Sequence, residues 1–161
     1  MTYQVGDQIV HPMHGAGVID SVISERINGS TREYYVFKMP AGGLVLKIPV
    51  ANSDVIGIRP IISAEAAETL MNELPNVTAE CNRNWNKRFQ ENLQRIKSGD
   101  LYEVAKVVKS LTQLEQRRTL STGERKMLQN ARQILVSEVV LASHQSESDI
   151  ESRVDQAMLS A

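Results

Sequence analysis

The sequence contains a single cysteine, few aromatic residues (4%) and no uninterrupted apolar run of membrane-spanning length. One cysteine, Cys81, can form neither an intramolecular disulfide nor a metal site of several thiolates, which is typical of a protein of the reducing cytoplasm. The first residues also lack the basic and apolar regions of a signal peptide. These absences predict a cytoplasmic protein that is neither secreted nor embedded in a membrane.

The composition is that of an ordinary globular protein. Hydrophobic residues make up 42% of the 161 residues and charged residues 23%, which is enough to bury a core. This length allows one ordinary domain or two small ones. The composition changes near Pro60, because seven of the nine glycines lie before it. We therefore expect two parts of different structure.

The part before Pro60 has the signals of a small β domain. Short runs rich in Val, Ile and Tyr alternate with Gly, Pro and Asn, a pattern typical of strands and tight turns. Asn28-Gly29 predicts a type I′ hairpin turn, because both residues tolerate positive φ. Short strands joined by tight turns favour a small curved barrel, which leaves few edges unpaired. The predicted strands are residues 8–11, 17–23, 32–39, 44–48 and 55–58.

The part after Pro60 has the periodicity and the caps of helices. Ser63 is a candidate N-cap for the first helix, and Asp100 and Ser121 each stand three residues before a glutamate, which is the spacing of a capping box. The predicted helices are residues 64–74, 84–98 and 101–118, a longest one that carries Met127 to Val139 on its apolar face, and a short last one capped by Ser146 or Ser148. The sequence thus predicts an α+β fold, with a β-barrel over residues 1–60 and a compact all-α domain over residues 61–161.

The formal net charge of -1 conceals a strong segregation of charge. Residues 82–132 hold 12 Lys and Arg against 5 Asp and Glu, a net charge of +7, whereas residues 1–81 and residues 133–161 each carry -4. A basic block between two acidic ones raises the local potential toward phosphate groups. The middle of the chain is therefore a candidate for contact with nucleic acid.

The sequence offers little for catalysis. His11 and His14, with Asp7 or Asp20 nearby, could complete a metal site, but no further strong ligand stands at a characteristic spacing, and we interpret both histidines as turn residues. Cys81 has no histidine near it in the sequence, and no phosphate-binding loop is present. We predict a protein that is not an enzyme, with no catalytic residues, cofactor, metal or small-molecule substrate.

The only tryptophan, Trp85, lies in a polar and basic cluster at residues 82–89. In one interpretation Trp85 begins an apolar stripe with Phe89, Leu93 and Ile96 and belongs to the core. In the other, asparagine and basic side chains bind phosphates or groove edges, while the flat ring stacks on a base or opens a base step. Both interpretations remain open from the residues alone.

Several motifs, taken in order along almost the whole chain, resemble the CarD/CdnL family of bacterial transcription factors. The first lies in the predicted barrel and is shared with transcription-repair coupling factors. The cluster around Trp85 and the run after Leu120 are more specific. The matching stretches are Val5-Gly6-Asp7, His11-Pro12-Met13-His14-Gly15-Ala16-Gly17, Lys47-Ile48-Pro49, Asn84-Trp85-Asn86-Lys87-Arg88-Phe89 and Leu120-Ser121-Thr122-Gly123-Glu124-Arg125-Lys126-Met127-Leu128, followed by Ala131-Arg132.

The resemblance implies a Tudor-like barrel that binds the β subunit of RNA polymerase and a helical domain that contacts promoter DNA at the upstream edge of the melted bubble. In the family a tryptophan enters the minor groove as a wedge that hinders bubble collapse, with little sequence specificity. Carried over to this chain, the wedge is Trp85, and the implied location is the nucleoid, reached through polymerase. The DNA-binding candidates are Asn84, Trp85, Lys87, Arg88, Arg125 and Lys126.

For the polymerase contact, the resemblance points to Arg26, Ile27 and Lys47. Two positions depart from some relatives: Glu25 stands where a basic residue occurs in them, and Gln90 where lysine does. Both departures bear on the strength of the contacts rather than on the family.

Two other functions compete with this one. A general nucleic-acid-binding protein would use the barrel itself. However, residues 1–81 have a net charge of -4 and contain few aromatic rings on which bases could stack. A protein adaptor would dock the basic block on an acidic partner and keep Trp85 buried. Strong binding of DNA by the barrel would favour the first alternative, and a buried indole would favour the second.

Overall fold

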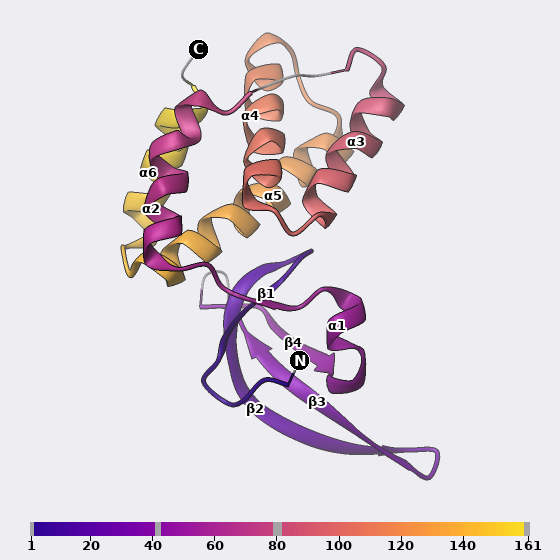
Figure 1. Cartoon of the computed structure of the whole chain (residues 1–161). Helices are drawn as coiled ribbons and strands as arrows, with labels where there is room; N and C mark the ends of the chain where they lie inside the picture. The colour runs from indigo at the N-terminus through magenta and orange to yellow at the C-terminus, as the bar shows by residue number, and fades with distance from the viewer. Residues whose placement is uncertain (1, 41–42, 79–81, 160–161) are drawn as a thin grey trace.

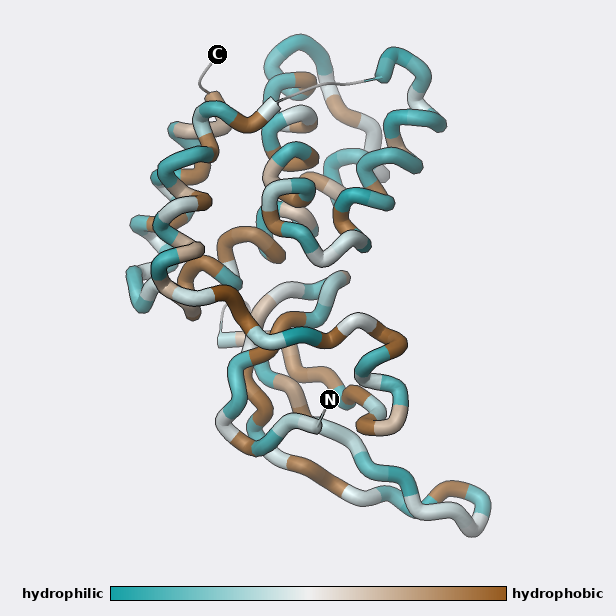
Figure 2. The backbone as a smooth tube through the Cα atoms, viewed as in Figure 1, coloured by the Kyte–Doolittle hydropathy of each residue, from teal (hydrophilic) through white to brown (hydrophobic). Residues whose placement is uncertain are grey.

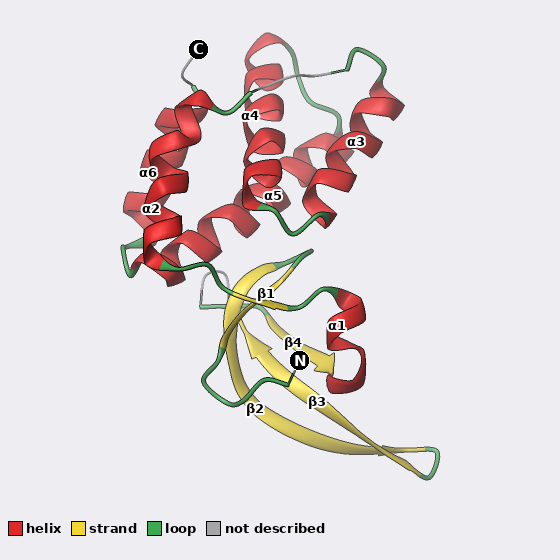
Figure 3. Cartoon of the chain, viewed as in Figure 1, coloured by secondary structure: helices red, strands yellow, loops and turns green. Residues whose placement is uncertain are grey.

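The computed structural model describes residues 2–40, 43–78 and 82–159 (Figure 1). The first part is an antiparallel sheet with the strand order β4-β3-β2-β1-β5. The second part is helical (Figure 3). The predicted α+β class is therefore confirmed. The strands are β1 (Gln8–His11), β2 (Gly15–Ile27), β3 (Ser30–Lys38), β4 (Val45–Pro49) and β5 (Arg59–Pro60).

The sheet curves around a core of its own, and in the described chain β4 and β5 are its two edges, so the barrel is incompletely closed. The hairpin between β2 and β3 turns at Asn28 and Gly29, whose φ values are 50° and 80°, as a type I′ turn requires. Tyr3 ties the N-terminus to this core, since its hydroxyl donates to the Ile58 carbonyl at 3.1 Å. The buried core residues are Tyr3, Ile9, Ile19, Tyr35, Phe37, Met39, Ile48 and Ile58.

The prediction of a strand over residues 55–58 is wrong. Ser53–Ile56 forms a short helix, α1, preceded by the 3₁₀ turn η1 (Val50–Asn52), and Gly57 ends it with φ at +97°. The Ser53 hydroxyl donates to the Val50 carbonyl at 3.0 Å, a local bond of the kind that competes with strand pairing. β-Branched residues suggested a strand, but Val55 is exposed on the helix rather than paired in the sheet.

The predicted helices are present with their caps. They are α2 (Ala64–Glu73) with the 3₁₀ turn η2 (Leu74–Asn76), α3 (Trp85–Lys97), α4 (Leu101–Arg117), α5 (Thr122–Ser143) and α6 (Glu147–Met158). Ser63, Asp100, Ser121 and Ser146 each accept a backbone N–H from the first turn, which replaces a bond that a helix start lacks. The predicted domain boundary at residues 60 and 61 lies in the connection from β5 to α2.

Helix α5 runs through the centre of the helical part and also meets the sheet (Figure 1). Figure 2 shows that the tube is mostly hydrophilic along α3 and hydrophobic along the part of α5 nearest the sheet. In that part of α5, Ile134, Leu135 and Val139 are buried in the helical core. The start of α5 lies away from the sheet, beside the start of α3, where the candidate site is found.

Candidate nucleic-acid interface

Trp85 is the first residue of α3, and its side chain stays accessible: it is 41% exposed. The indole stacks on Phe89, with 5.1 Å between the ring centroids and 15° between the planes. Its Nε1–H donates to the Ser121 hydroxyl oxygen at 3.2 Å. Of the predicted apolar stripe, Ile96 is buried and Phe89 and Leu93 pack on the core. Trp85 therefore lies at the exposed end of the stripe, and Phe89 and Ser121 fix the orientation of its ring.

The asparagines before Trp85 build the turn that presents it. The Asn84 side chain is the N-cap of α3, because its Oδ1 accepts from the Lys87 backbone N–H at 3.1 Å. The Asn84 backbone N–H in turn donates to Asn82 Oδ1 at 2.9 Å. Asn84 is exposed, but its side-chain oxygen Oδ1 already accepts the hydrogen bond from the Lys87 backbone N–H. The cap fixes where α3 begins and thereby where Trp85 points.

The structure does not allow Arg88 to be a direct phosphate contact, which corrects that prediction. Arg88 is 2% exposed and lies against Glu124, which is 1% exposed. Two bonds join the side chains, Nε to Oε2 at 2.7 Å and Nη2 to Oε1 at 3.0 Å, and Nη1 donates to the Asn82 carbonyl at 3.0 Å. Arg88 thus ties the start of α3 to the start of α5 and to the preceding turn.

The pair also controls the charge of Glu124. The hydrogen bonds from Arg88 lower the pKa of the Glu124 carboxyl below its ordinary value, although burial by itself raises it. Glu124 therefore remains ionised as the partner of Arg88. The spacing Ser121-x-x-Glu124 predicted a capping box. Only its first half is present as such, since Ser121 Oγ accepts from the Glu124 N–H at 3.2 Å while the Glu124 carboxylate bonds Arg88.

Sequence reasoning missed the second role of Ser121. Its hydroxyl both caps α5 and accepts the indole N–H of Trp85. Gly123 follows in the same turn, and a Cβ atom there would lie 3.6 Å from Phe89 and 3.9 Å from Trp85. The capping spacing was visible in the sequence, but nothing in it indicated that this cap lies beside Trp85.

Three of the predicted cationic residues are exposed near the starts of α3 and α5, the two helices that the Trp85–Ser121 hydrogen bond joins. Lys87 lies in the first turn of α3, and Arg125 and Lys126 follow the N-cap of α5. Arg125 donates to the Leu120 carbonyl at 3.4 Å. In the described part of the chain no ion pair involves Lys87 or Lys126. An exposed ring beside cations at two helix N-termini suits an anionic partner that offers flat, stackable groups.

The predicted polymerase-binding residues lie on two strands of the sheet. Arg26 and Ile27 end β2 at the hairpin, and Lys47 is in the edge strand β4. Strand alternation places Arg26 on the face opposite to Ile27 and Glu25. Lys47 forms an ion pair with Glu25, so the departure at Glu25 gives Lys47 a partner within the chain. The structure therefore brings Glu25 and Lys47 together but separates Arg26 from them.

His11 and His14 form a pair in the β1–β2 turn, with 4.6 Å between the ring centroids. His11 Nδ1 accepts the Met13 backbone N–H at 3.1 Å, so this nitrogen carries no proton. Burial, with a smaller effect from His14, lowers the pKa of His11 to about 4. Within residues 2–40, 43–78 and 82–159 no cluster of three or more His, Cys, Asp or Glu side chains could hold a metal ion; Cys81 lies outside these ranges.

Comparison with known proteins covers both parts of the chain. Residues 3–62 match the family described as "CarD-like/TRCF RID domain", and residues 66–155 match "CarD, C-terminal domain". The chain belongs to the CarD family. It is 31% identical over 150 residues to the "Putative transcription factor YdeB" of Bacillus subtilis (strain 168), an alignment that covers 93% of this chain and 98% of the relative. The resemblance found in the motifs is thereby confirmed.

Among solved structures, the solution NMR structure of the 72-residue N-terminal domain of Myxococcus xanthus CarD aligns with 37% of this chain and 79% of its own. The TM-score is 0.32 and the sequence identity 22%.

The CarD family assignment points to a transcription factor rather than an enzyme. The N-terminal match is to RNA polymerase-interacting domains, which supports polymerase as a partner. None of the described helices is both long and apolar enough to cross a membrane.

Proposed function

We propose that this CarD family protein binds the β subunit of RNA polymerase through residues 1–60 and stabilises the open promoter complex through residues 61–161. In this proposal Trp85 enters the minor groove at the upstream edge of the melted bubble and hinders its collapse. Lys87, Arg125 and Lys126 contact the phosphates, and Asn84 and Arg88 support the ring. The protein accordingly acts at the nucleoid, in complex with polymerase.

The observation that carries the proposal is the exposed but ordered indole of Trp85. An aromatic or apolar wedge must overcome a few kcal/mol of base unstacking. Ordering a mobile side chain on binding costs roughly a further 0.5–1.5 kcal/mol. Trp85 avoids much of that second cost, because Phe89 and Ser121 already hold the ring in the free protein.

Tethering explains how a small DNA contact is sufficient. Binding of the sheet to polymerase makes the DNA contact intramolecular and raises its effective concentration. On the sheet, the edge strand β4 has one side open in the described chain, and Val45, two residues before Lys47 on the same strand, is exposed. An open edge with an exposed apolar residue suits a protein partner that adds a strand. We expect free DNA to bind weakly and without sequence preference.

The two alternatives have less support. An adaptor with a buried tryptophan does not agree with an indole that is 41% exposed. A barrel that binds nucleic acid directly has to overcome the net charge of -4 on residues 1–81. A gel shift with the whole protein and free DNA at near-physiological salt separates this alternative, since strong binding without polymerase would favour it.

The decisive experiment measures the lifetime of open complexes formed by bacterial RNA polymerase, with the native protein, with Trp85→Ala and without addition. We expect the native protein to lengthen the lifetime and Trp85→Ala to lose most of this effect. Tyr102→Ala is the matched control, because Tyr102 is an aromatic residue of similar exposure (38%) on α4. Equal loss in both variants, or no effect of the native protein, would contradict the proposal.

A further inference from the structure

Helix α5 connects the candidate DNA interface to the sheet. Its N-cap, Ser121, holds Trp85, and its middle part, from Gln133 to Glu138, contacts the β1–β2 turn and the β5–α2 connection. At 1.5 Å per residue, Glu124 and Ser137 are about 20 Å apart along the helix axis. One continuous helix therefore spans the distance from the candidate DNA interface to the sheet that carries the proposed polymerase contact.

The first contact joins α5 to the β1–β2 turn. The Ala16 backbone N–H donates to the Ser137 hydroxyl oxygen at 2.9 Å, and Gln133 Nε2 donates to the His14 carbonyl at 3.0 Å. Gly15 lies between these bonds with φ at +118°, and a Cβ atom there would lie 2.3 Å from Ser137 Oγ and 3.3 Å from Ile134 Cα. Only glycine allows the turn to approach the helix this closely.

The second contact joins α5 to β5 and to the connection that follows it. The Glu138 carboxylate is completely buried and accepts three hydrogen bonds, from Arg59 Nη1 at 2.8 Å, Arg59 Nη2 at 2.7 Å and the Ile62 N–H at 2.9 Å. A buried carboxylate is stable only while its partners remain in place. Any rotation of one part against the other would withdraw Arg59 or Ile62 from Glu138.

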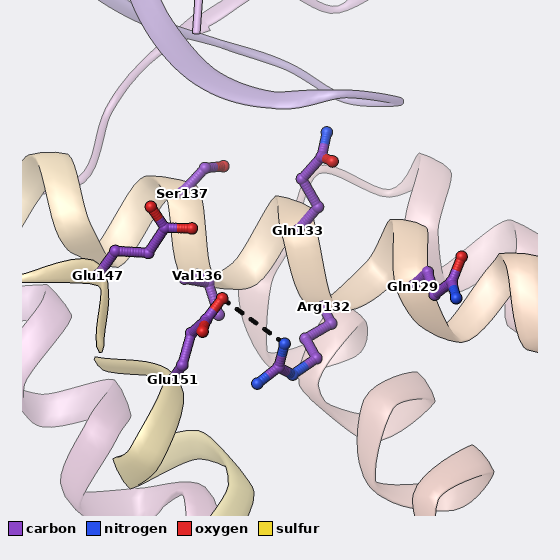
Figure 4. A pocket seen from close by; sticks show the side chains of 7 residues that line it. All are labelled: Gln129, Arg132, Gln133, Val136, Ser137, Glu147 and Glu151. Carbon is purple, nitrogen blue, oxygen red and sulfur yellow. Dashed lines mark ion pairs between the residues drawn. The ribbon is translucent and has the colours of Figure 1, made fainter. Parts of the chain in front are cut away.

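Figure 4 shows Gln133 and Ser137 on the side of α5 that faces the sheet, while Arg132 reaches the Glu151 carboxylate of α6 on the other side. A cavity of about 230 Å³ lies along this part of α5, lined by Gln133, Ser137 and Glu147 among others. The contact between the parts thus combines a few directed polar bonds and a close backbone approach with the packing of Met13, Ile61 and Ile62 on the helical core. The polar bonds specify an orientation, because each needs its own geometry.

We infer that Gly15, Ser137 and Glu138 are positioning residues that lock the sheet and the helical part in one orientation, so that a sheet bound to polymerase carries Trp85 to a fixed place. This inference rests on the proposed function for its purpose, but the lock itself is a property of the free protein. A rigid connection between the sheet and the helical part gives the contact of Trp85 with DNA a higher effective concentration than a flexible connection of the same length.

The lock is tested by the distance between two nitroxide labels, measured by pulsed electron paramagnetic resonance. The labels are placed at Ser30→Cys on β3 and Gln116→Cys on α4, with Cys81→Ser to prevent a third label. We expect one narrow distance distribution in the otherwise native chain and a shifted or broadened one in Gly15→Ala. Gly6→Ala is the matched control: Gly6 also has positive φ (+93°), but a Cβ atom there would meet nothing within 4 Å.

Glu138→Ala, which removes the three bonds to Arg59 and Ile62, provides the second variant in case Gly15→Ala does not fold. A broad distribution in the native chain, or a native distribution in both folded variants, would overturn the lock. The open-complex lifetime is measured on the same variants. Here we expect the unlocked ones to lose most of the lifetime gain while polymerase binding and Trp85 fluorescence are unchanged.

A failure of the lock and a failure of the proposed function are distinguishable. If the native protein does not change the lifetime, the proposed function fails, and the label distances still decide the lock. If the distances confirm the lock but unlocked variants retain the full lifetime gain, the positioning role of these residues is wrong while the proposed function is retained.

Discussion

The side chains of Arg88 and Glu124 form the buried pair on which the shape of the candidate site depends. Removing one partner of such a pair leaves a buried charge without compensation, which typically costs about 3–5 kcal/mol. We predict that Glu124→Gln lowers the free energy of unfolding of the helical part by roughly 3 kcal/mol at pH 7. Urea denaturation followed by circular dichroism measures this, with the exposed Glu115→Gln as the control, for which we expect a change within about 0.5 kcal/mol.

The same pair makes the free energy of unfolding depend on pH, with lower stability in acid. Because Arg88 lowers the pKa of Glu124 in the folded protein, this stabilisation is complete above the ordinary glutamate pKa of about 4.3 and is lost as the pH falls through the lower folded value. Glu124→Gln should therefore show a smaller loss of stability in this acid range than the native protein. Parallel curves for the two proteins would contradict this.

His11 makes a separate contribution at higher pH. Its pKa is lowered from 6.5 to about 4, so protonation is easier in the unfolded chain. The stability it supports is present above pH 6.5 and decreases as the pH falls toward 4. We predict that His11→Asn, whose amide oxygen can still accept the Met13 N–H as in an Asx turn, flattens the unfolding free energy between these pH values. A dependence as steep as that of the native protein would show that His11 is not the titrating group.

At the scale of whole elements, the first turn of α5 combines a cap with contact to the rings of the site. Gly123 makes this turn less stable than a residue with a side chain would, because glycine loses more conformational freedom on folding. A Cβ atom added at this position would lie at ordinary contact distance from Phe89 and Trp85. We predict that Gly123→Ala stabilises the protein by about 0.4–1 kcal/mol and leaves the open-complex lifetime gain intact. Thermal unfolding and Trp85 fluorescence test this together; a loss of stability or a changed emission would show that the ring cannot accept the methyl group.

The elements that the sequence predicted well are those with local signals. Caps such as Ser63 and Asp100 specify a helix start through bonds to the next few residues, and Asn28-Gly29 specifies its own turn. Residues 55–58 were predicted wrongly because their β-branched pattern competed with a helical turn held by Ser53. Arg88 was misassigned because its burial depends on Glu124, 36 residues away, and no local pattern reports such a partner. The role of Ser121 at Trp85 was not predictable for the same reason.

For the whole molecule, the pairing of charges decides which cations remain available. Arg132 bonds Asp155 and Arg153 bonds Glu68, so the cations near the acidic helix α6 are largely neutralised within the chain. Lys87 and Lys126, at the opposite end of the helical part, have no ion pair in the described chain. The net charge of +7 on residues 82–132 thus includes Lys87 and Lys126 as available cations at the starts of α3 and α5. The molecule should therefore approach DNA with the starts of α3 and α5 first, and with α6 turned away.

This orientation predicts which lysine contributes to the salt dependence. Each phosphate contact releases counterions and adds about 0.9 to the slope of log K against log salt concentration. The slope is measured for binding of the protein to polymerase on promoter DNA, with binding to polymerase alone as the reference. We predict that Lys126→Gln lowers the magnitude of this slope by about the same amount. Lys106→Gln is the control, because Lys106 is paired with Glu103 at 2.8 Å and lies on α4. An equal change of slope in both variants would mean that DNA responds to the overall charge of the helical part. A change in Lys126→Gln alone would locate a phosphate contact at the start of α5, where the proposed insertion of Trp85 requires one.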